Sequence, residues 1–309
     1  MDRIREVIKG QRKIAVFPIV GADHCAWLLN KEFSSVASSG ERLAEVLRYG
    51  YNLYQYDMIL VFSDPYVEAQ ALGCPIELEP FPKLLGPKSN SGIDRTKEII
   101  KATVLLKQST DCPIFVSIKG PFSLAGFLAG IENFLKTSIL KEKEAKALIN
   151  YALEFQINYL NRLLSQEANI FIGDPLASVS IISPELFSLF AYEPLRILIK
   201  KIKETGLLVG LHICGETKPI IPILDSLGAD ILSLEDLYPK SNTLRMGGIS
   251  TQTIFFSTPK EIARAVKSVL TNYQLAPSLI LATACDVPMT TNPDNIKAMV
   301  RAANEFNRN

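Results

Sequence analysis

Short apolar runs alternate along the chain with longer amphipathic stretches. An apolar run bounded by polar or turn residues predicts a buried strand, and apolar positions recurring every three to four residues predict a helix. A short helix is predicted at residues 1–11, ahead of the first strand. Eight strands are predicted at 13–20, 58–62, 113–118, 169–172, 206–216, 230–235, 244–250 and 278–284. Strands that alternate with helices in this way predict a (β/α)8 TIM barrel, a single α/β domain over residues 1–309.

Local signals mark several helix starts and one insertion. Ser38 and Glu41, three residues apart, predict a capping box before the helix RLAEVLRYGYNLY. Ser183, Thr258 and Asn292 each precede a proline, which is typical of an N-cap followed by the first helical residue. A proline-rich excursion near 74–93 predicts a hairpin or lid beside the barrel mouth. A doubly wound open sheet is the alternative fold, but IVGADH after the first strand contains one glycine and no glycine-rich phosphate loop.

Polar side chains collect where the predicted strands end. In a (β/α)8 barrel the carboxyl ends of the strands carry the active site. The polar residues at these ends are Asp64, Lys119, Asp174, His212, Cys214, Glu235, Asp236 and Cys285. We therefore expect these side chains to face one rim of the barrel.

The run GLLVGLHICGE brings an imidazole and a thiol to the end of one strand. Residues i and i+2 of a strand lie on the same side, about 6 to 7 Å apart along the backbone, so His212 and Cys214 can face one point. Cys285, at the end of the strand SLILATAC, is the best third ligand. Two thiolates with one imidazole favour Zn²⁺, and three protein ligands leave a position for a substrate. Taken singly, each of these residues could equally be structural, as we expect for Cys25, Cys74 and Cys112.

Composition narrows the class of protein. The chain has 309 residues, of which 48% are hydrophobic, and 33 Lys and Arg residues nearly balance 32 Asp and Glu residues. This balance argues against nucleic acid or a membrane surface as partner. Five unevenly spaced cysteines indicate a reducing compartment, and the apolar run from Ile14 to Gly21 is too short to cross a bilayer. We expect a cytoplasmic protein.

The motifs SDPYVEAQALGCP, GPFSLAG, GDPLASVSIISPELF, LHICG and CDVPMTTNPDNIKAMV together resemble the uroporphyrinogen decarboxylase superfamily. More narrowly, His-x-Cys followed much later by Cys resembles the methylcobamide:coenzyme M methyltransferase branch. The resemblance implies a (β/α)8 barrel, zinc held by His212, Cys214 and Cys285, and methyl transfer from methylcobalamin, the corrinoid methyl donor, to a small thiol such as coenzyme M.

The chain departs from true uroporphyrinogen decarboxylases after the first strand. Those enzymes carry an arginine-rich segment there that holds substrate carboxylates, whereas this chain reads VGADHCAWLLN without an arginine. It also has no Asp-x-His-x-x-Gly pattern of a cobalamin-binding domain, because His24 is followed by CAW and His212 by ICG. We therefore expect a separate corrinoid protein as partner; the sequence leaves the oligomeric state open.

Further site residues follow from the resemblance and from strand ends. Asp64, Asp174 and Asp236 are candidate catalytic residues, each with a turn or capping role as the alternative. The spacing His-x-Cys, an acidic residue and a later Cys also resembles cobalamin-independent methionine synthase, and this resemblance makes either Glu235 or Asp236 the candidate fourth zinc ligand, with Asp236 favoured on spacing. Gly120 and Gly248 are candidates for close backbone approach to the cofactor.

Two other functions stay open at this point. One is a cofactor-free decarboxylase of the uroporphyrinogen type, which the missing arginines oppose. The other is a noncatalytic barrel that binds zinc or a corrinoid protein. If the acceptor carries a sulfonate, Lys119 and Arg245 are the candidate counterparts.

Overall fold

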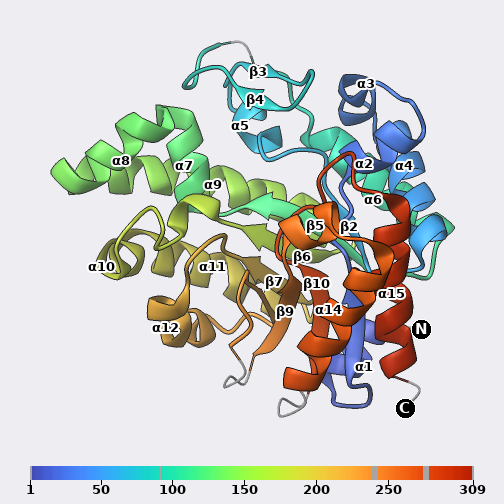
Figure 1. Ribbon diagram of the computed structural model, residues 1–309. Coiled ribbons are helices and arrows are strands. Elements are labelled where there is room, and N and C mark those ends of the chain that lie inside the picture. The colour runs from blue at the N-terminus through green and yellow to red at the C-terminus, as the bar shows by residue number, and fades with distance from the viewer. Residues whose placement is uncertain (1, 91, 239–242, 274–277, 308–309) are drawn as a thin grey trace.

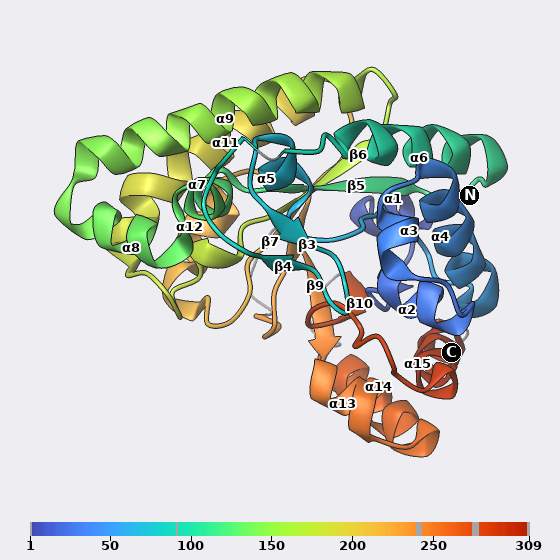
Figure 2. The same ribbon diagram turned by 90° about the horizontal axis from the view of Figure 1, so that it is seen from above.

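A parallel eight-stranded sheet forms the centre of the protein. The structure is a computed structural model and describes residues 2–90, 92–238, 243–273 and 278–307. In the order in which they pair, the strands are β1 (Ile14–Phe17), β10 (Leu279–Thr283), β9 (Leu244–Ile249), β8 (Ile231–Ser233), β7 (Val209–His212), β6 (Asn169–Gly173), β5 (Ile114–Lys119) and β2 (Ile59–Val61). The sheet curves inside a layer of helices (Figure 1 and Figure 2). The (β/α)8 prediction is confirmed, with six strands shorter than predicted, β5 shifted by one residue and β6 longer by one residue.

Helices flank the sheet and follow most of its strands. In the first half of the chain they are α1 (Arg3–Ile8), α2 (Ala22–Leu28), α3 (Phe33–Ala37), α4 (Gly40–Tyr54), α5 (Val67–Ala71), α6 (Thr96–Ser109), α7 (Pro121–Ala129), α8 (Ile131–Leu140) and α9 (Glu142–Leu164). In the second half they are α10 (Pro184–Leu186), α11 (Tyr192–Lys203), α12 (Ile221–Ser226), α13 (Thr251–Phe256), α14 (Pro259–Asn272) and α15 (Pro293–Phe306). Short 3₁₀ turns lie at Pro175–Ala177 and Lys218–Ile220, and a π-helical segment at Phe187–Ala191 joins α10 to α11. None of the described helices is long and apolar enough to cross a membrane.

The strands are buried on both faces because helices cover one side and the barrel interior the other. Every residue of β1, β6 and β10 is buried. Strands of this kind are continuous apolar runs rather than alternating ones. This explains why the sequence pattern located all eight of them.

The barrel has a seam between β1 and β2, which do not pair with each other in the described chain. Asp57, just before the amino end of β2, joins that strand to Val16, the third residue of β1. Its backbone N–H donates to the carbonyl of Val16 at 2.9 Å, and its side chain accepts from the Val16 N–H at 2.8 Å. The other carboxylate oxygen pairs with Arg3 at 2.6 Å. Asp57 therefore supplies some of the hydrogen bonds that a direct pairing of β1 with β2 would have formed.

Most predicted helix starts are confirmed. Ser183, Thr258 and Asn292 are N-caps whose side chains accept backbone N–H groups, and Thr258 forms a full capping box. The prediction for Ser38 is wrong: Ser39 caps α4 and accepts from the Arg42 N–H. Ser38 instead ends the preceding helix α3 as its C-cap, a helix too short for the sequence pattern to separate.

The proline-rich excursion forms a hairpin. Its strands β3 (Ile76–Glu77) and β4 (Lys83–Leu84) pair in antiparallel register. The hairpin stands at the top of the molecule in Figure 1 and over its centre in the view from above (Figure 2). The hairpin prediction is confirmed; a lid function for residues 74–93 stays a prediction.

Candidate metal centre

The three predicted soft ligands meet at one rim of the barrel. His212 is the last residue of β7, Cys214 follows two residues later, and Cys285 lies two residues beyond β10. One ligand atom from each lies within 4.8 Å of the other two, and His212 Nε2 lies 3.0 Å from Cys214 Sγ. This is the one group of three or more His, Cys, Asp or Glu residues with metal-binding geometry in the described part of the chain.

The register between β7 and β8 fixes the orientation of the His212 ring. His212 lies opposite Ser233, whose carbonyl oxygen and hydroxyl lie 3.2 and 3.1 Å from Nδ1. Because a carbonyl oxygen only accepts hydrogen bonds, Nδ1 carries the proton and donates it there. Nε2 is left with its lone pair toward the sulfur atoms, which is the tautomer that a metal requires.

The two thiols share a hydrogen bond that separates their acidities. Cys285 donates to the sulfur of Cys214, which lowers the pKa of Cys214. The same hydrogen bond, together with burial, raises the pKa of Cys285. The other three cysteines are buried thiols of the core, where burial raises the pKa of Cys74 to about 11 and those of Cys25 and Cys112 to about 12. Their burial in the core supports the prediction that they are structural residues.

The donor set fits Zn²⁺. One imidazole nitrogen and two thiols converge, and no further residue of the described chain joins the cluster. Ser233 contacts the imidazole at Nδ1, on the side away from the thiols. Tetrahedral zinc sites with three protein ligands keep a fourth position for a substrate. Glu235 lies beside the site, since its Oε1 accepts from the Gly215 N–H at 2.7 Å. Asp236 is exposed and, like Glu235, lies outside the cluster, so its predicted role stays a prediction.

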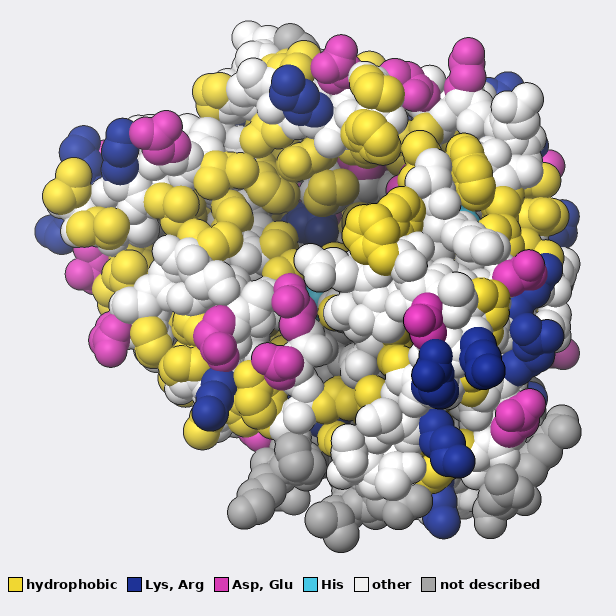
Figure 3. Space-filling model, in the orientation of Figure 1, with side chains coloured by type: hydrophobic (Ala, Val, Ile, Leu, Met, Phe, Trp, Pro, Cys, Tyr) yellow, Lys and Arg dark blue, Asp and Glu magenta, His cyan; other side chains and the backbone are white. Residues whose placement is uncertain are grey.

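A cavity of about 230 Å³ opens beside the three candidate ligands. Figure 3 shows this face of the molecule, with hydrophobic side chains around a central hollow. The cavity is lined by the three ligands and by Ile19, Leu60, Phe62, Pro65, Ser117, Lys119, Phe171, Gly173, Pro175 and Asp286. An apolar wall with few polar groups is typical of a small-molecule site.

Asp64 is not among the residues that line this cavity. Arg95 holds both of its carboxylate oxygens, one of them at 3.1 Å from Nη2, and the Ser63 hydroxyl and the Tyr66 N–H also donate to it. The ion pair is buried, with side-chain exposures of 3% for Arg95 and 0% for Asp64. These contacts support a structural role, and the catalytic role predicted for Asp64 stays a prediction.

Asp174 and Gly120 lie together behind the cavity. Asp174 Oδ1 accepts from the Ser123 N–H at 2.8 Å, while Oδ2 is buried without a partner. Burial raises the pKa of Asp174 to about 6. A Cβ at Gly120 would stand 2.1 Å from Asp174 Oδ2, so the glycine makes room for this carboxylate. Gly248 has φ +112° and faces Val269 and Leu237, so both predicted cofactor-binding glycines contact protein side chains.

The structure gives two buried residues, Glu68 and Ser233, contacts near the candidate metal site that the sequence does not indicate. Glu68 accepts from the Lys119 N–H with both carboxylate oxygens, at 3.1 and 3.0 Å, and burial raises its pKa to about 7. Ser233 orients the metal-site imidazole. Neither contact has a signal in the sequence, because both depend on which strands become neighbours.

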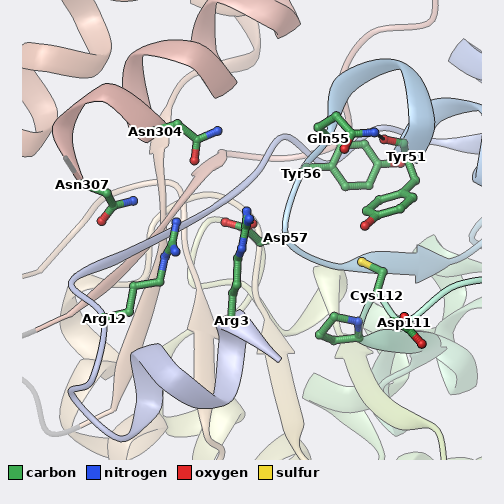
Figure 4. A pocket seen from close by; sticks show the side chains of 11 residues that line it. Arg3, Arg12, Tyr51, Gln55, Tyr56, Asp57, Asp111, Cys112, Asn304 and Asn307 are labelled. Carbon is green, nitrogen blue, oxygen red and sulfur yellow. Dashed lines mark hydrogen bonds and ion pairs between the residues drawn. The ribbon is translucent and has the colours of Figure 1, made fainter. Parts of the chain in front are cut away.

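A larger cavity of about 490 Å³ lies at the opposite end, where the strands begin (Figure 4). Its polar walls include Arg3, Arg12, Asp57 and Asn307. Arg12 and Asn307 both donate to the carbonyl of Ile14, at 2.7 and 3.1 Å. These groups therefore fasten β1 rather than approach the metal ligands.

The chain matches one protein-family model and resembles a solved structure along nearly its whole length. The family model described as Uroporphyrinogen decarboxylase (URO-D) matches residues 19–306. A solved structure described as a methyltransferase from Methanosarcina mazei superposes with a TM-score of 0.86, at 23% identity, and covers 98% of each chain. This likeness confirms the fold.

Curated relatives share about a quarter of their residues with this chain. Methylcobamide:CoM methyltransferase MtbA of Methanosarcina mazei is 25% identical over 295 residues, which cover 87% of this chain and 86% of the relative. The methylated-thiol–coenzyme M methyltransferase of the same organism is 26% identical over 266 residues, covering 78% and 71%. Methylcobamide:CoM methyltransferase MtaA of Methanosarcina barkeri is 25% identical over 267 residues, covering 78% and 77%.

Proposed function

We propose that this chain, which belongs to the uroporphyrinogen decarboxylase (URO-D) family, is a zinc-dependent methyltransferase that moves a methyl group from a methylated corrinoid to a small thiol. The names of its curated relatives support a methyltransferase that uses a corrinoid. The observation that carries the proposal is the convergence of His212, Cys214 and Cys285 beside a cavity.

The metal supplies one part of the chemistry. Bound by these three side chains, Zn²⁺ would lower the pKa of a coordinating thiol and hold its sulfur in the nucleophilic thiolate form. The chain's own residues hold the site: Ser233 keeps the proton of the imidazole on Nδ1, and the two thiols lie within ligand distance.

The cavity positions the acceptor and excludes water. Its walls include Ile19, Leu60, Phe62 and Phe171, so a short thiol lying against them reaches the ligands in a largely apolar space. In the reaction a bond forms between the acceptor sulfur and the methyl carbon, and the cobalt–carbon bond breaks with its electron pair left on cobalt. The thiol proton leaves to solvent. Holding the two reactants in line supplies much of the acceleration.

The methyl donor approaches from outside the barrel. A cavity of about 230 Å³ takes a small thiol, whereas a corrinoid is several times larger. The corrinoid must therefore cover the mouth, the hollow in Figure 3, with its methyl group directed inward. Both histidines of this chain are engaged elsewhere: His24 is buried between Tyr54 and the carbonyl of Met289, and His212 lies in the metal cluster. This supports a separate corrinoid protein as carrier.

Decarboxylation of a porphyrinogen is the alternative that the contacts oppose. Such a substrate needs free cationic groups for its carboxylates. Both buried arginines of the described chain, Arg95 and Arg245, are already paired with the carboxylates of Asp64 and Asp225. No observation favours a noncatalytic barrel over an enzyme.

The test is metal content together with thiol methylation by free methylcobalamin. We expect about one zinc per chain and methyl transfer to thiols, with both lost in Cys285→Ala and in His212→Ala. Cys112→Ala, a buried core cysteine, is the matched control and should keep both. Zinc binding and methyl transfer that survive Cys285→Ala would contradict the proposal.

A further inference from the structure

The cavity of about 490 Å³ at the amino ends of the strands is larger than the one beside the candidate metal ligands, and the proposed reaction does not use it. It lies at the seam between β1 and β2. Its lining includes Tyr56 and Asp57, which precede β2, and Asn307, whose side chain donates to the carbonyl of Ile14 in β1. Clefts of roughly 300 to 1,000 Å³ hold small-molecule ligands in proteins, so this cavity has the size of a binding site.

Arg12 is a cationic group of this cavity without a counter-ion in the described chain. Its Nε donates to the carbonyl of Ile14 at 2.7 Å, and no carboxylate of the described residues lies within 4.0 Å of its guanidinium. The other arginine of the lining, Arg3, pairs with Asp57 at 2.6 Å, and Asp57 gives its second oxygen to the Val16 N–H. Arg12 therefore keeps both Nη groups of its fork available to a ligand.

Three carboxamides, those of Asn304, Asn307 and Gln55, also line the cavity. Asn307 and Gln55 donate to backbone carbonyls through their nitrogens, which leaves their oxygens as acceptors. Asn304, on α15, makes no side-chain hydrogen bond to the described residues. In the view of Figure 4, Arg12 lies between Asn307 and Arg3, with Asn304 above them. Oxygens of this kind are acceptors for hydroxyl groups.

Two features of the cavity oppose an anion, and both are weak. Asp111, the remaining carboxylate of the lining, is exposed in the turn between α6 and β5, where water solvates it. Gln55 and Asn307 are the C-caps of α4 and α15, so two helix ends with partial negative charge border the cavity. A bidentate pair between a guanidinium and an oxyanion is stronger than the field of an exposed helix end.

We propose that this cavity is a second binding site, which takes a small hydroxylated molecule with one carboxylate or phosphate group. The oxyanion accepts from both Nη groups of Arg12, and the hydroxyls donate to the oxygens of Asn304, Asn307 and Gln55. Sugar acids and sugar phosphates share this chemistry. The inference concerns the end of the barrel opposite the metal ligands and does not depend on the proposed function.

The first test compares four probes by calorimetry on the full chain: gluconate, glucose 6-phosphate, glucose and inorganic phosphate. We expect at least one of the two hydroxylated anions to bind with a Kd of about 1 mM or lower. Glucose and inorganic phosphate should bind at least about ten-fold more weakly, because each lacks one part of the contacts. Binding by neither hydroxylated anion would overturn the inference. Glucose or inorganic phosphate that binds as tightly as the hydroxylated anions would also overturn it.

Variants locate the two halves of the ligand. Arg12→Met should weaken binding of the hydroxylated anions at least about ten-fold and leave glucose unchanged. Asn304→Ala should weaken them about three-fold or more, without lowering the stability of the ligand-free protein, because this side chain makes no hydrogen bond in the described structure. Arg48→Met, an exposed arginine of α4 outside the lining, is the matched control and should bind as the unmodified chain does.

Affinity that is unchanged in Arg12→Met would overturn the inference. Arg12→Lys keeps the charge and loses the fork, so it repeats the test should the methionine variant fail to fold; unchanged affinity in this variant would overturn the inference equally.

A second readout separates this site from the metal centre. A ligand that binds only the folded state raises the urea midpoint. The hydroxylated anion that binds should therefore raise the midpoint of the unmodified chain and of Cys285→Ala, but not that of Arg12→Met at the same concentration. Loss of the effect in Cys285→Ala would place the ligand in the metal-centre cavity and refute the second site. None of these measurements involves methyl transfer, so failure of the proposed function would leave the inference standing.

Discussion

Glu68 should make the stability of the protein depend on pH in the direction opposite to that of a salt-bridged carboxylate. Burial raises its pKa from 4.5 to about 7, against the opposing field of Lys119. The folded state therefore binds more protons than the unfolded state between these two values. Its contribution to stability is complete below pH 4.5 and is lost as the pH rises through 7.

The magnitude follows from the two pKa values. The full shift of the Glu68 pKa corresponds to about 3 kcal/mol of unfolding free energy, of which about 2 to 3 kcal/mol is lost between pH 5 and pH 8. Glu68→Gln removes the titrating group and keeps an oxygen that can accept from the Lys119 N–H. We expect the unfolding free energy of this variant, minus that of the unmodified protein, to rise by this amount from pH 5 to pH 8.

The assay is urea denaturation of both metal-free proteins at intervals of pH, with the difference taken at each pH so that other titrating groups cancel. Glu154→Gln, on the exposed face of α9, is the matched control, and we expect its difference to stay constant. A difference for Glu68→Gln that is flat, or that falls with rising pH, would refute the reasoning. It would mean that the folded state keeps this carboxylate ionised despite its burial.

Three further results are expected. Ser233→Ala should weaken zinc binding about ten-fold, because the imidazole of His212 loses one of the two acceptors that orient it. The affinity is measured by competition with a chromophoric chelator. An unchanged affinity would show that the backbone carbonyl of residue 233 suffices. Gly120→Ala should lower the unfolding free energy by about 1–3 kcal/mol, since its Cβ meets the buried Asp174 carboxylate at 2.1 Å; an unaltered urea midpoint would contradict this. Asp57→Ala should lower the unfolding free energy by about 2–4 kcal/mol in the same assay, because the buried Val16 N–H loses its acceptor and the ion pair with Arg3 is lost. A decrease of less than about 0.5 kcal/mol would argue against a role of Asp57 in joining β1 to β2.

The sequence predicted the strands and the ligand triad for the same physical reason. Strands buried on both faces are continuous apolar runs, so their carboxyl ends can be located, and His212, Cys214 and Cys285 stand at those ends. In a parallel barrel all such ends meet at one rim. Convergence of the three ligands therefore followed from the fold alone.

Contacts that depend on register or on side-chain direction could not be predicted. Asp64 also stands at a strand end, but its carboxylate forms a buried ion pair with Arg95, which lies 31 residues later in the chain. Arg245 was a candidate for binding an anion, yet it is paired with Asp225. Nothing in the sequence distinguishes these charges from that of Lys119, which lines the cavity.

The pairing of β1 with β10 has a consequence for synthesis of the protein. Ile14 lies beside Leu279 in the sheet, so the first strand to leave the ribosome has no strand to pair with until nearly the whole chain has been made. The same late segment carries Cys285. A nascent or prematurely terminated chain that lacks this segment has no strand with which β1 can pair and lacks one of the three proposed metal ligands, so the proposed metal site can form only when nearly the whole chain has been made.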